Sequence, residues 1–373
     1  MKLTIDRTAF FPALSHVQSV VERRTISPIL ANVLLSPQGS KLRLTTTDLD
    51  ISVQEEVAAN IQDDAHPTTV NALTLYEIVR KLPDGSQIEL KHNLEAHQLH
   101  VKCGRARFQL PTLPAEDFSG SVIAELPHRF EISAEDLRNL FHLTRFSMST
   151  EDARYYLNGI NFHLFRKGKE EVLRAVATDG HRLALAEIKA PEGSSGMPGI
   201  IIPRKTVMEI CRLLEGESNT VTLSLSLTQI VFSFGNIHVQ SRLIDGNFPN
   251  YEEVIPKHNT QELVVDTDAL KEAVDRVALL SQEKTRGIKL ILSKNQLTVS
   301  VSSPDIGSAT EEIEVKYSGD HRDTGFNARY LLEILQQITT DDVHCFLGEE
   351  SAPVIFKNGD NASVLFVLMP MRL

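Results

Sequence analysis

The feature that most constrains the fold of this chain is a pattern that occurs three times along it. In each copy a Glu-Ile pair stands at the same place among apolar residues with matching offsets. The copies begin about 120 to 130 residues apart, which is far longer than a solenoid period and matches the length of a whole domain. The three copies are residues 71–82, 203–214 and 327–338.

A second element repeats with nearly the same spacing, at residues 3–10, 130–137 and 263–270. Each copy is a short alternating strand that runs into a helix, with a side-chain oxygen available for the first free N–H groups at Asp6, Ser133 and Asp266. Each repeat therefore carries two helices and several strands, which predicts an α+β chain. We expect the three domains to be residues 1–127, 128–259 and 260–373, joined by extended stretches that contain proline.

The composition is that of an ordinary globular protein, with 373 residues of which 42% are apolar. Cys103, Cys211 and Cys345 lie far apart and form no metal-ligand spacing, so we expect small buried thiols in a reducing compartment. The opening residues alternate and lack the basic and apolar regions of a signal peptide. A cytoplasmic protein is expected.

The formal net charge of −11 argues against a nucleic-acid partner unless the basic residues are gathered on one surface. In the second helix of each repeat, apolar residues at i, i+3, i+4 and i+7 form one buried stripe, and the opposite face mixes basic and acidic residues. A solvated helix face is the ordinary interpretation, but recurrence in three repeats favours a shared role. The residues on this face are Arg80, Lys205, Arg212 and Arg329 with Glu77, Glu209 and Glu333.

The common motifs of catalysis are absent from the sequence, including the P-loop, GxGxxG, GxSxG and HExxH patterns. Residues 281–284 fit S-x-x-K, but the companion motifs of that enzyme class are missing. His92, His97 and His100 lie in a polar hairpin without helical pairing, so we predict neither a metal nor another cofactor.

A more distinctive motif covers residues 177–183, where Thr178-Asp179 repeats the pair Thr47-Asp48. Asp-Gly suits a turn at the end of a strand, so a repeated hairpin is one interpretation. His181 and Arg182 are added only in the second repeat. An enzyme centred on Asp179 and His181 stays open as an alternative, but no positioned nucleophile accompanies them and a binding role fits better.

Several further motifs occur in order along the whole chain, and together with these residues they resemble the bacterial DNA polymerase III beta subunit, or sliding clamp. The resemblance implies three DNA-clamp domains that form half of a closed ring, a head-to-tail homodimer around double-stranded DNA. It implies a processivity factor that tethers replicative and repair DNA polymerases and other clamp-binding proteins, is loaded by a separate clamp loader, and has no catalytic activity. The matching stretches include 28–30, 47–49, 154–159, 176–183, 203–205, 243–251 and 369–373.

Ring size supports two chains independently of the resemblance. Helices packed side by side lie about 10 Å apart, so six helices in a closed circle leave only about 9 Å clear. Twelve helices leave about 28 Å, which admits duplex DNA roughly 20 Å wide. Head-to-tail closure brings the first repeat of one chain to the third of the other. A monomeric peptide-binding scaffold that does not encircle DNA remains the alternative.

The resemblance also implies three sets of site residues. At the dimer interface, Phe108 and Leu110 are expected to pack against Leu279 and Leu280 of a second copy, although all four could instead belong to their own domain cores. The expected partner-peptide pocket, with adaptable Met side chains among its apolar residues, consists of Leu157, Thr178, Gly180, His181, Arg182, Leu183, Pro249, Val254, Val367, Met369, Pro370, Met371 and Arg372. The residues expected to face DNA are Arg24, Arg80, Arg154, Tyr155, Tyr156, Arg204 and Lys205.

Three acidic residues depart from close relatives. Glu252 and Glu253 stand where arginines can occur, and we expect them to alter peptide preference at the pocket rim. Glu151 stands where a relative has an amide, and its charge is expected to weaken DNA contact from that loop.

Overall fold

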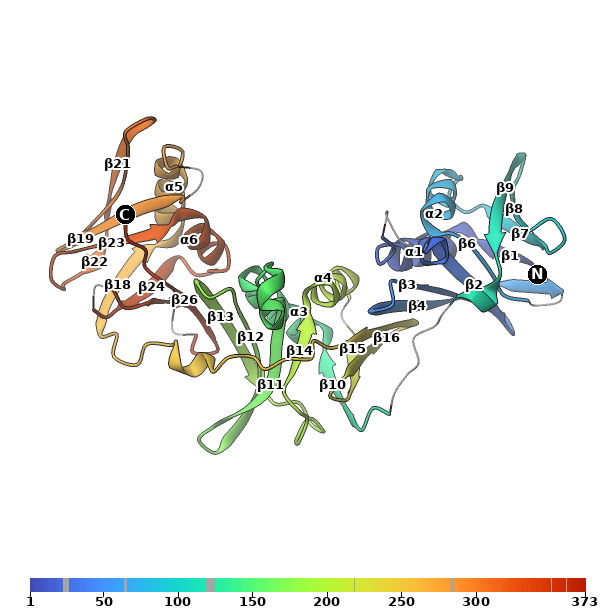
Figure 1. Ribbon diagram of the computed structural model, residues 1–373, viewed down its shortest axis with the longest axis horizontal. Coiled ribbons are helices and arrows are strands. Elements are labelled where there is room, and N and C mark those ends of the chain that lie inside the picture. The colour runs from blue at the N-terminus through green and yellow to red at the C-terminus, as the bar shows by residue number, and fades with distance from the viewer. Residues whose placement is uncertain are drawn as a thin grey trace. The chain divides into compact units, whose positions relative to one another are not determined.

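The computed structural model describes residues 1–22, 27–63, 66–118, 125–217, 219–282, 285–349, 351–359 and 361–373. These residues form two compact units (Figure 1). The first unit consists of residues 1–138, 191–198 and 205–243, and the second of 139–190, 199–204 and 244–373.

Helices form where the two repeated patterns predict them. Asp6 accepts a hydrogen bond from the backbone of Thr8 and Asp266 from that of Ala269, while Ser133 Oγ accepts from Asp136 N, so all three predicted N-caps are confirmed. The described helices are α1 (Arg7–Gln18), α2 (Ala72–Lys81), α3 (Ala134–Thr144), α4 (Arg204–Leu213), α5 (Thr267–Ala278) and α6 (Ala328–Leu335). Short 3-10 turns are η1 (Pro28–Ala31), η2 (Ala115–Asp117), η3 (Arg145–Ser147), η4 (Asp152–Leu157) and η5 (Tyr251–Glu253).

The predicted apolar stripe of the second helices is buried in α4 and α6, and in α2 with the exception of the half-buried Ile78. No helix in the described ranges is both long and apolar enough to cross a membrane.

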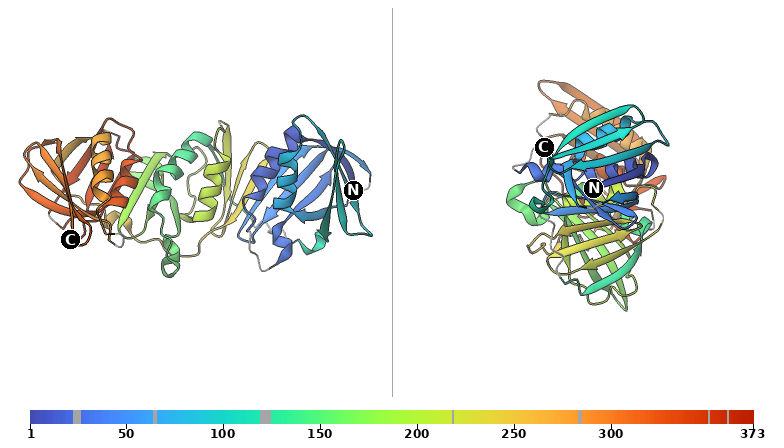
Figure 2. Two further views of the ribbon diagram at one scale, coloured as in Figure 1. Left: turned by 90° about the horizontal axis from the view of Figure 1, so that it is seen from above. Right: turned by 90° about the vertical axis from the view of Figure 1, so that its right-hand side faces the viewer.

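One antiparallel sheet of 13 strands runs through the first unit. Helices α1 and α2 pack against each other on it, and α1 covers β3 and β4 (Figures 1 and 2). Its strands, in spatial order, are β10 (His128–Ser133), β15 (Thr220–Leu225), β16 (Gln229–Phe234), β17 (Ile237–Arg242), β4 (Ile51–Ala58), β3 (Lys41–Thr47), β2 (Asn32–Gln38), β6 (Thr68–Asn71), β9 (Ala106–Leu113), β8 (Gln98–Cys103), β7 (Gln87–Asn93), β1 (Lys2–Asp6) and β5 (Asn60–Asp63).

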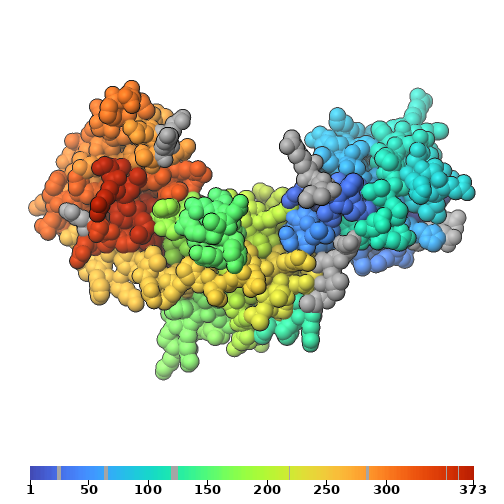
Figure 3. All heavy atoms as spheres, viewed as in Figure 1, coloured from blue at the N-terminus to red at the C-terminus, as the bar shows by residue number. Residues whose placement is uncertain are grey.

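The second unit contains a sheet of nine strands and a sheet of four. The nine are β14 (Ile200–Pro203), β11 (Gly159–Lys167), β12 (Glu170–Thr178), β13 (Arg182–Lys189), β26 (Val364–Leu368), β25 (Val354–Asn358), β24 (Asp342–Leu347), β18 (Gln261–Asp266) and β22 (Lys316–Tyr317). The four are β21 (Gly307–Glu314), β20 (Gln296–Ser303), β19 (Gly287–Ser293) and β23 (Arg322–Asn327). The last residues of the chain lie at the surface of this unit (Figure 3).

Two strand pairings join residues from different predicted domains. Strand β17 pairs with β4, with Val239 opposite Val53, and β13 pairs with β26, with Leu183 opposite Val367. Each compact unit therefore contains part of the second predicted domain, and the boundaries at residues 127/128 and 259/260 stay a prediction.

Candidate binding site

A tight turn between β12 and β13 places the 177–183 motif at the surface of the second unit. Thr178 Oγ1 donates to the carbonyl of Arg182 at 2.7 Å, and Asp179 Oδ1 accepts from the backbone N–H groups of His181 and Arg182. Gly180 adopts φ of +87°, which a side chain would strain. The predicted strand-ending turn is confirmed, and it leaves the His181 side chain exposed.

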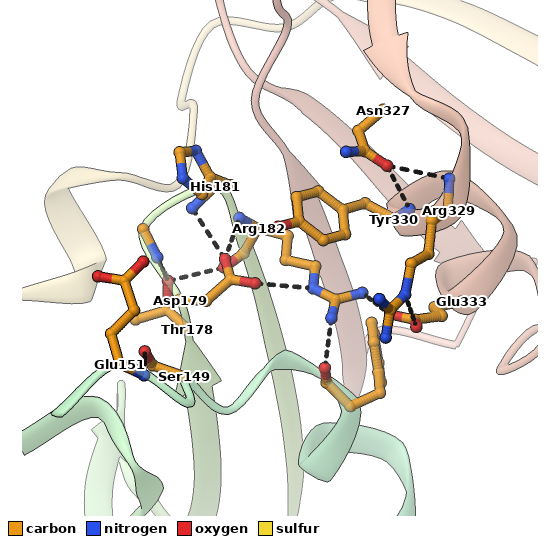
Figure 4. Close-up of polar contacts among 12 residues, drawn as sticks. Ser149, Glu151, Thr178, Asp179, His181, Arg182, Asn327, Arg329, Tyr330 and Glu333 are labelled. Atoms are coloured by element: carbon orange, nitrogen blue, oxygen red, sulfur yellow. Dashed lines mark hydrogen bonds and ion pairs between the residues drawn. The ribbon is translucent and has the colours of Figure 1, made fainter. Parts of the chain in front are cut away.

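The Arg182 side chain points from this turn toward α6 (Figure 4). Its Nε donates to Asp179 Oδ2 at 3.1 Å, its Nη2 donates to the carbonyl of Phe146 at 2.6 Å, and its Nη1 pairs with Glu333. The guanidinium carbon also lies 4.4 Å from the ring centroid of Tyr330. With only 6% of the side chain exposed, Arg182 binds the turn to α6 and has little surface to offer a ligand.

The Glu333 carboxylate accepts hydrogen bonds from two arginines, Arg182 and Arg329. Burial alone would raise the pKa of this carboxyl, but hydrogen bonds from Arg329 and Arg182 outweigh it, so the pKa is lowered. Tyr330 stacks on the His181 ring, with centroids 6.2 Å apart. The recurring Glu-Ile pair was the sequence signal for Glu333, whereas nothing in the pattern pointed to Tyr330.

An apolar cluster lies beside the turn, where β13 pairs with β26. Its buried members are Val176, Leu183, Leu185, Tyr251, Ile355 and Val367, with Phe248, Ile255, Phe346 and Leu365 packed against them. The tail leaves the sheet after β26, with Met369 N donating to the carbonyl of His181 at 2.9 Å and Met371 N to that of Gly325 at 2.8 Å. Strand β26 itself is buried except for the half-buried Leu365.

The residues expected to form a pocket all lie in this unit, but at different depths. The buried members are Leu157, Thr178, Arg182, Leu183 and Val367, and the half-buried ones are Pro370 and Met371. The exposed members are Gly180, His181, Pro249, Val254, Met369 and Arg372.

A second buried arginine fixes the segment that carries Val254. Arg174 donates to Glu187 at 2.7 Å, to the hydroxyl of Tyr251 at 3.1 Å and to Glu252 at 2.5 Å. Glu252 is thus paired with a cation, while the exposed Glu253 accepts from Asn250 Nδ2 at 2.7 Å. Of the two acidic departures, Glu253 is the one more available to a partner. Sequence reasoning missed Arg174 because its partners are distant in the chain.

His163 completes the Arg174 cluster by bonding the Tyr251 hydroxyl through Nε2 at 2.9 Å. Burial, and secondarily the charge of Arg174, lower the pKa of His163 to about 4. The imidazole is therefore neutral in the folded protein at neutral pH.

Three of the four described cations that were expected to face DNA are engaged in ion pairs. Arg154 pairs with Glu151 at 2.7 Å, and its hydrogen bond lowers the pKa of that carboxyl. Arg80 pairs with Glu77 at 2.6 Å, and Lys205 pairs with Asp48 and, at 3.1 Å, with Glu22. Arg212 and Arg329 are likewise paired, so the basic residues on the mixed helix face are locally neutralised. Arg204 and Tyr155 are exposed, Tyr156 is half-buried, and Arg24 lies outside the described residues.

The four residues expected at a dimer interface differ in exposure. Leu110 is buried, Phe108 and Leu280 are half-buried, and Leu279 is 78% exposed. Leu279 therefore does not belong to its own domain core, whereas Leu110 is covered within its own chain.

The described residues offer little to catalysis or metal binding. Asp179 bonds the backbone of His181, and its other oxygen is taken by Arg182, so the two do not form an acid–base pair. Among the described residues, no group of three or more His, Cys, Asp or Glu side chains is placed to hold a metal. His92 bonds the hydroxyls of Thr68 and Thr112, and Ser281 Oγ donates to the carbonyl of Ala278.

Comparison with known proteins gives matches over the whole chain. Family models described as DNA polymerase III beta subunit match residues 1–122 (N-terminal domain), 131–250 (central domain) and 252–372 (C-terminal domain). The beta sliding clamp of Caulobacter vibrioides is 46% identical over 373 residues and that of Escherichia coli K12 is 37% identical over 375, each covering 100% of both chains.

Solved structures agree with the sequence matches. A DnaN sliding clamp from Bartonella birtlesii bound to griselimycin matches with a TM-score of 0.97 at 44% identity, covering 100% of both chains. The DNA polymerase sliding clamp from Caulobacter crescentus matches with a TM-score of 0.96 at 45% identity and the same coverage.

The neutral His163 makes stability depend on pH. Its pKa is about 4 when folded, below the ordinary value of about 6.5, so its contribution to stability is present above pH 6.5 and lost as pH falls toward 4. Between pH 7 and pH 5 we expect the free energy of unfolding by urea to fall by about 2 kcal/mol from this group. His163→Gln should remove that part of the fall, and His258→Gln, at an exposed position, should retain it. An equal fall in both variants would contradict the prediction.

Proposed function

The chain belongs to the DNA polymerase III beta subunit family, and from that premise we propose that it is a sliding clamp, a processivity factor for DNA polymerases. As a ring-shaped homodimer around duplex DNA it tethers replicative and repair polymerases and other clamp-binding proteins without reading sequence. The observation that carries the proposal is the match of all three clamp domains, in order, over the full chain.

Unpaired strand edges support a head-to-tail dimer. Residues 106–111 of β9 pair with β8 on one side, while β6 reaches only Thr112 and Leu113 on the other. Strand β21 is the last strand of its sheet, with β20 as its neighbour. Within the described ranges both edges have free backbone groups, and pairing with a second copy would satisfy them.

The charges of these two edges are complementary. Arg107 lies in β9 and Arg105 directly precedes this strand, while β21 carries Glu311, Glu312 and Glu314. One edge belongs to the first repeat and the other to the third, so each copy can meet the opposite charge on the next. The exposed Leu279 adds an apolar contact to the third repeat. The described ranges of two such chains contain twelve α-helices, enough for a ring that admits duplex DNA.

Contacts with DNA are proposed to be weak and sequence-independent. Arg154, Tyr155, Tyr156, Arg204 and Lys205 supply phosphate contacts, and Arg24 is proposed to join them. Because Arg154 and Lys205 already have carboxylate partners, each phosphate contact replaces an existing ion pair and gains little free energy. Retention on DNA then depends on the closed ring.

Partner peptides are proposed to bind around the exposed Val254, Met369 and His181, with the buried apolar cluster as the floor. Apolar anchors of a short segment would pack on this floor beside the exposed and adaptable Met369. A separate ATP-driven clamp loader opens the ring, and the chain itself catalyses no reaction.

Topological linkage is tested on circular DNA. After loading onto nicked circular duplex with a clamp loader and ATP, wild-type protein should be lost when the circle is cut once, because a ring slides off the ends. Leu279→Asp, which puts a charge at the exposed apolar contact, should not be retained even on the circle. Gel filtration measures the retained protein. Equal retention on circular and linear DNA would show that local contacts hold the protein and would refute the ring.

The peptide site is tested at the tail. Met371→Ala combined with deletion of Arg372 and Leu373 should weaken binding of griselimycin by about tenfold, because apolar contact area is lost. Isothermal titration calorimetry measures the affinity, and Leu227→Ala, at an exposed position 74% accessible, is the matched control. Dimer mass should be unchanged, and a monomeric variant would show that the tail is structural.

Glu151 tests the neutralised DNA contact. Glu151→Gln should free Arg154, tighten binding to non-specific duplex DNA and steepen its logarithmic salt dependence by about one unit. Fluorescence anisotropy over a salt series measures both. Asp152→Asn removes the same charge from the adjacent exposed position and should leave the slope unchanged. Identical slopes for both variants would contradict a special role for the Glu151–Arg154 pair.

A further inference from the structure

The glutamate of the recurring Glu-Ile pair lies at a junction between repeats. In the second repeat, Glu209 is only 8% exposed and accepts a hydrogen bond from Ser19 Oγ at 2.6 Å. Ser19 is the C-cap of α1, the first helix of the preceding repeat. The carboxylate is shared with Arg212, three residues farther along α4, at 2.5 Å.

Arg212 completes the contact with the end of α1. Its Nη2 donates to the carbonyl of His16 and to Ser19 Oγ, both at 2.8 Å. The last carbonyls of a helix have no partner within the helix, and the helix dipole makes a cation favourable there. The Glu209–Arg212 pair therefore closes the C-terminal end of the preceding repeat's first helix.

In the third repeat, the recurring glutamate also pairs with an arginine that donates to a carbonyl near the end of a helix, but this arginine comes from another part of the chain. Glu333 holds Arg182, and Arg182 Nη2 donates to the carbonyl of Phe146 in η3, the turn that follows α3 (Figure 4). Again the recurring glutamate and an arginine meet the chain just after the first helix of the preceding repeat.

The first repeat has the same pair at an exposed position. Glu77 and Arg80 have the spacing of Glu209 and Arg212, since both helices contain Glu-Ile-x-Arg. Arg80 Nη2 donates to Glu77 Oε2 at 2.6 Å, and the side chains are 49% and 40% exposed. Glu209 is thus buried at the junction in the second repeat, whereas both side chains of the corresponding pair in the first repeat are at least 40% exposed.

The matching helix end is also exposed, and its last carbonyls, which accept hydrogen bonds from the following residues, each keep capacity for a further donor. Helices α1 and α5 both have 12 residues, with N-caps Asp6 and Asp266 and C-caps Ser19 and Leu279. Leu279 is therefore the counterpart of Ser19, and it is 78% exposed. A groove of about 470 Å³ lies there, and Asp275, Leu279 and Arg286 are among the residues that line it.

We propose that Glu77 and Arg80 form the same junction between two copies of the chain, with Arg80 donating to the last carbonyls of α5 of a second copy. The inference rests on the proposed head-to-tail dimer. It identifies a polar pair that stabilises the dimer interface by contacting the end of α5 of the second copy. It assigns Arg80 to the dimer junction and not to DNA.

Arg80→Ala tests the assignment. Sedimentation velocity of the full chain over a dilution series should show the dimer dissociation constant raised on the order of tenfold, as expected for losing a charged hydrogen bond. Lys81→Ala removes the same charge from the next residue, also exposed, and should stay within about twofold. Glu77→Gln, which preserves shape, should weaken the dimer several-fold. Arg212→Ala, the counterpart within one chain, should lower the melting temperature and leave the dissociation constant of the dimer nearly unchanged.

The failures are distinguishable. A wild-type protein that is monomeric throughout the series would refute the ring and this inference together. A dimer that is disrupted by Leu279→Asp yet unaffected by Arg80→Ala would refute the inference alone. Non-specific duplex binding is compared in the Leu279→Asp background with and without Arg80→Ala, and equal salt dependence is expected. A shallower salt dependence in the variant that lacks Arg80 would show that Arg80 contacts DNA and would overturn the assignment.

Discussion

Backbone hydrogen bonds between strands of different repeats are the constraint on which the rest of the structure depends. Strand β17 pairs with β4, and β13 pairs with β26, so the 13-stranded and the nine-stranded sheets each continue across a predicted domain boundary. Each residue in such a ladder has its N–H and C=O satisfied, and a sheet that is interrupted leaves them exposed. The second pairing also sets the site, because it places the Thr178–Arg182 turn beside the Met-Pro-Met tail.

The requirement that backbone N–H and C=O groups be hydrogen-bonded is not met at two strand edges, one in the first repeat and one in the third. In the described residues, β9 has an incomplete neighbour and β21 has none on its outer side. Free edges in a soluble protein invite unwanted pairing, and opposite charges on the two edges restrict the choice of partner. Under the proposed function, the β9 edge of one copy pairs with the β21 edge of the other, so no further element is needed to cover either edge. The same pairing closes the ring and determines which partner is accepted.

Local features of the fold were predictable and long-range ones were not. The N-caps Asp6 and Asp266, the buried helix stripes and the turn at Gly180 follow from short-range rules and are confirmed. The partners of the charged residues do not follow, because Lys205 and Asp48 are 157 residues apart and Arg182 and Glu333 are 151 apart. The mixture of basic and acidic residues on the helix face was therefore visible in the sequence, but the ion pairs that these residues form were not. Recurrence of Glu77, Glu209 and Glu333 was visible, but only the contacts of the last two give it a meaning.

The ion pairs also reconcile a net charge of −11 with a DNA partner. A free cation gains from phosphate contact through release of counterions, and many such contacts would hold DNA in place. Where Lys205 and Arg154 already bind carboxylates, approach of a phosphate exchanges one anion for another, and the free-energy difference between positions along the duplex becomes small. A protein held by ring closure requires weak contacts of this kind to move. Under the proposed function, the acidic partners of Lys205 and Arg154 therefore favour sliding, while the strand edges and helix ends provide the strength of the assembly.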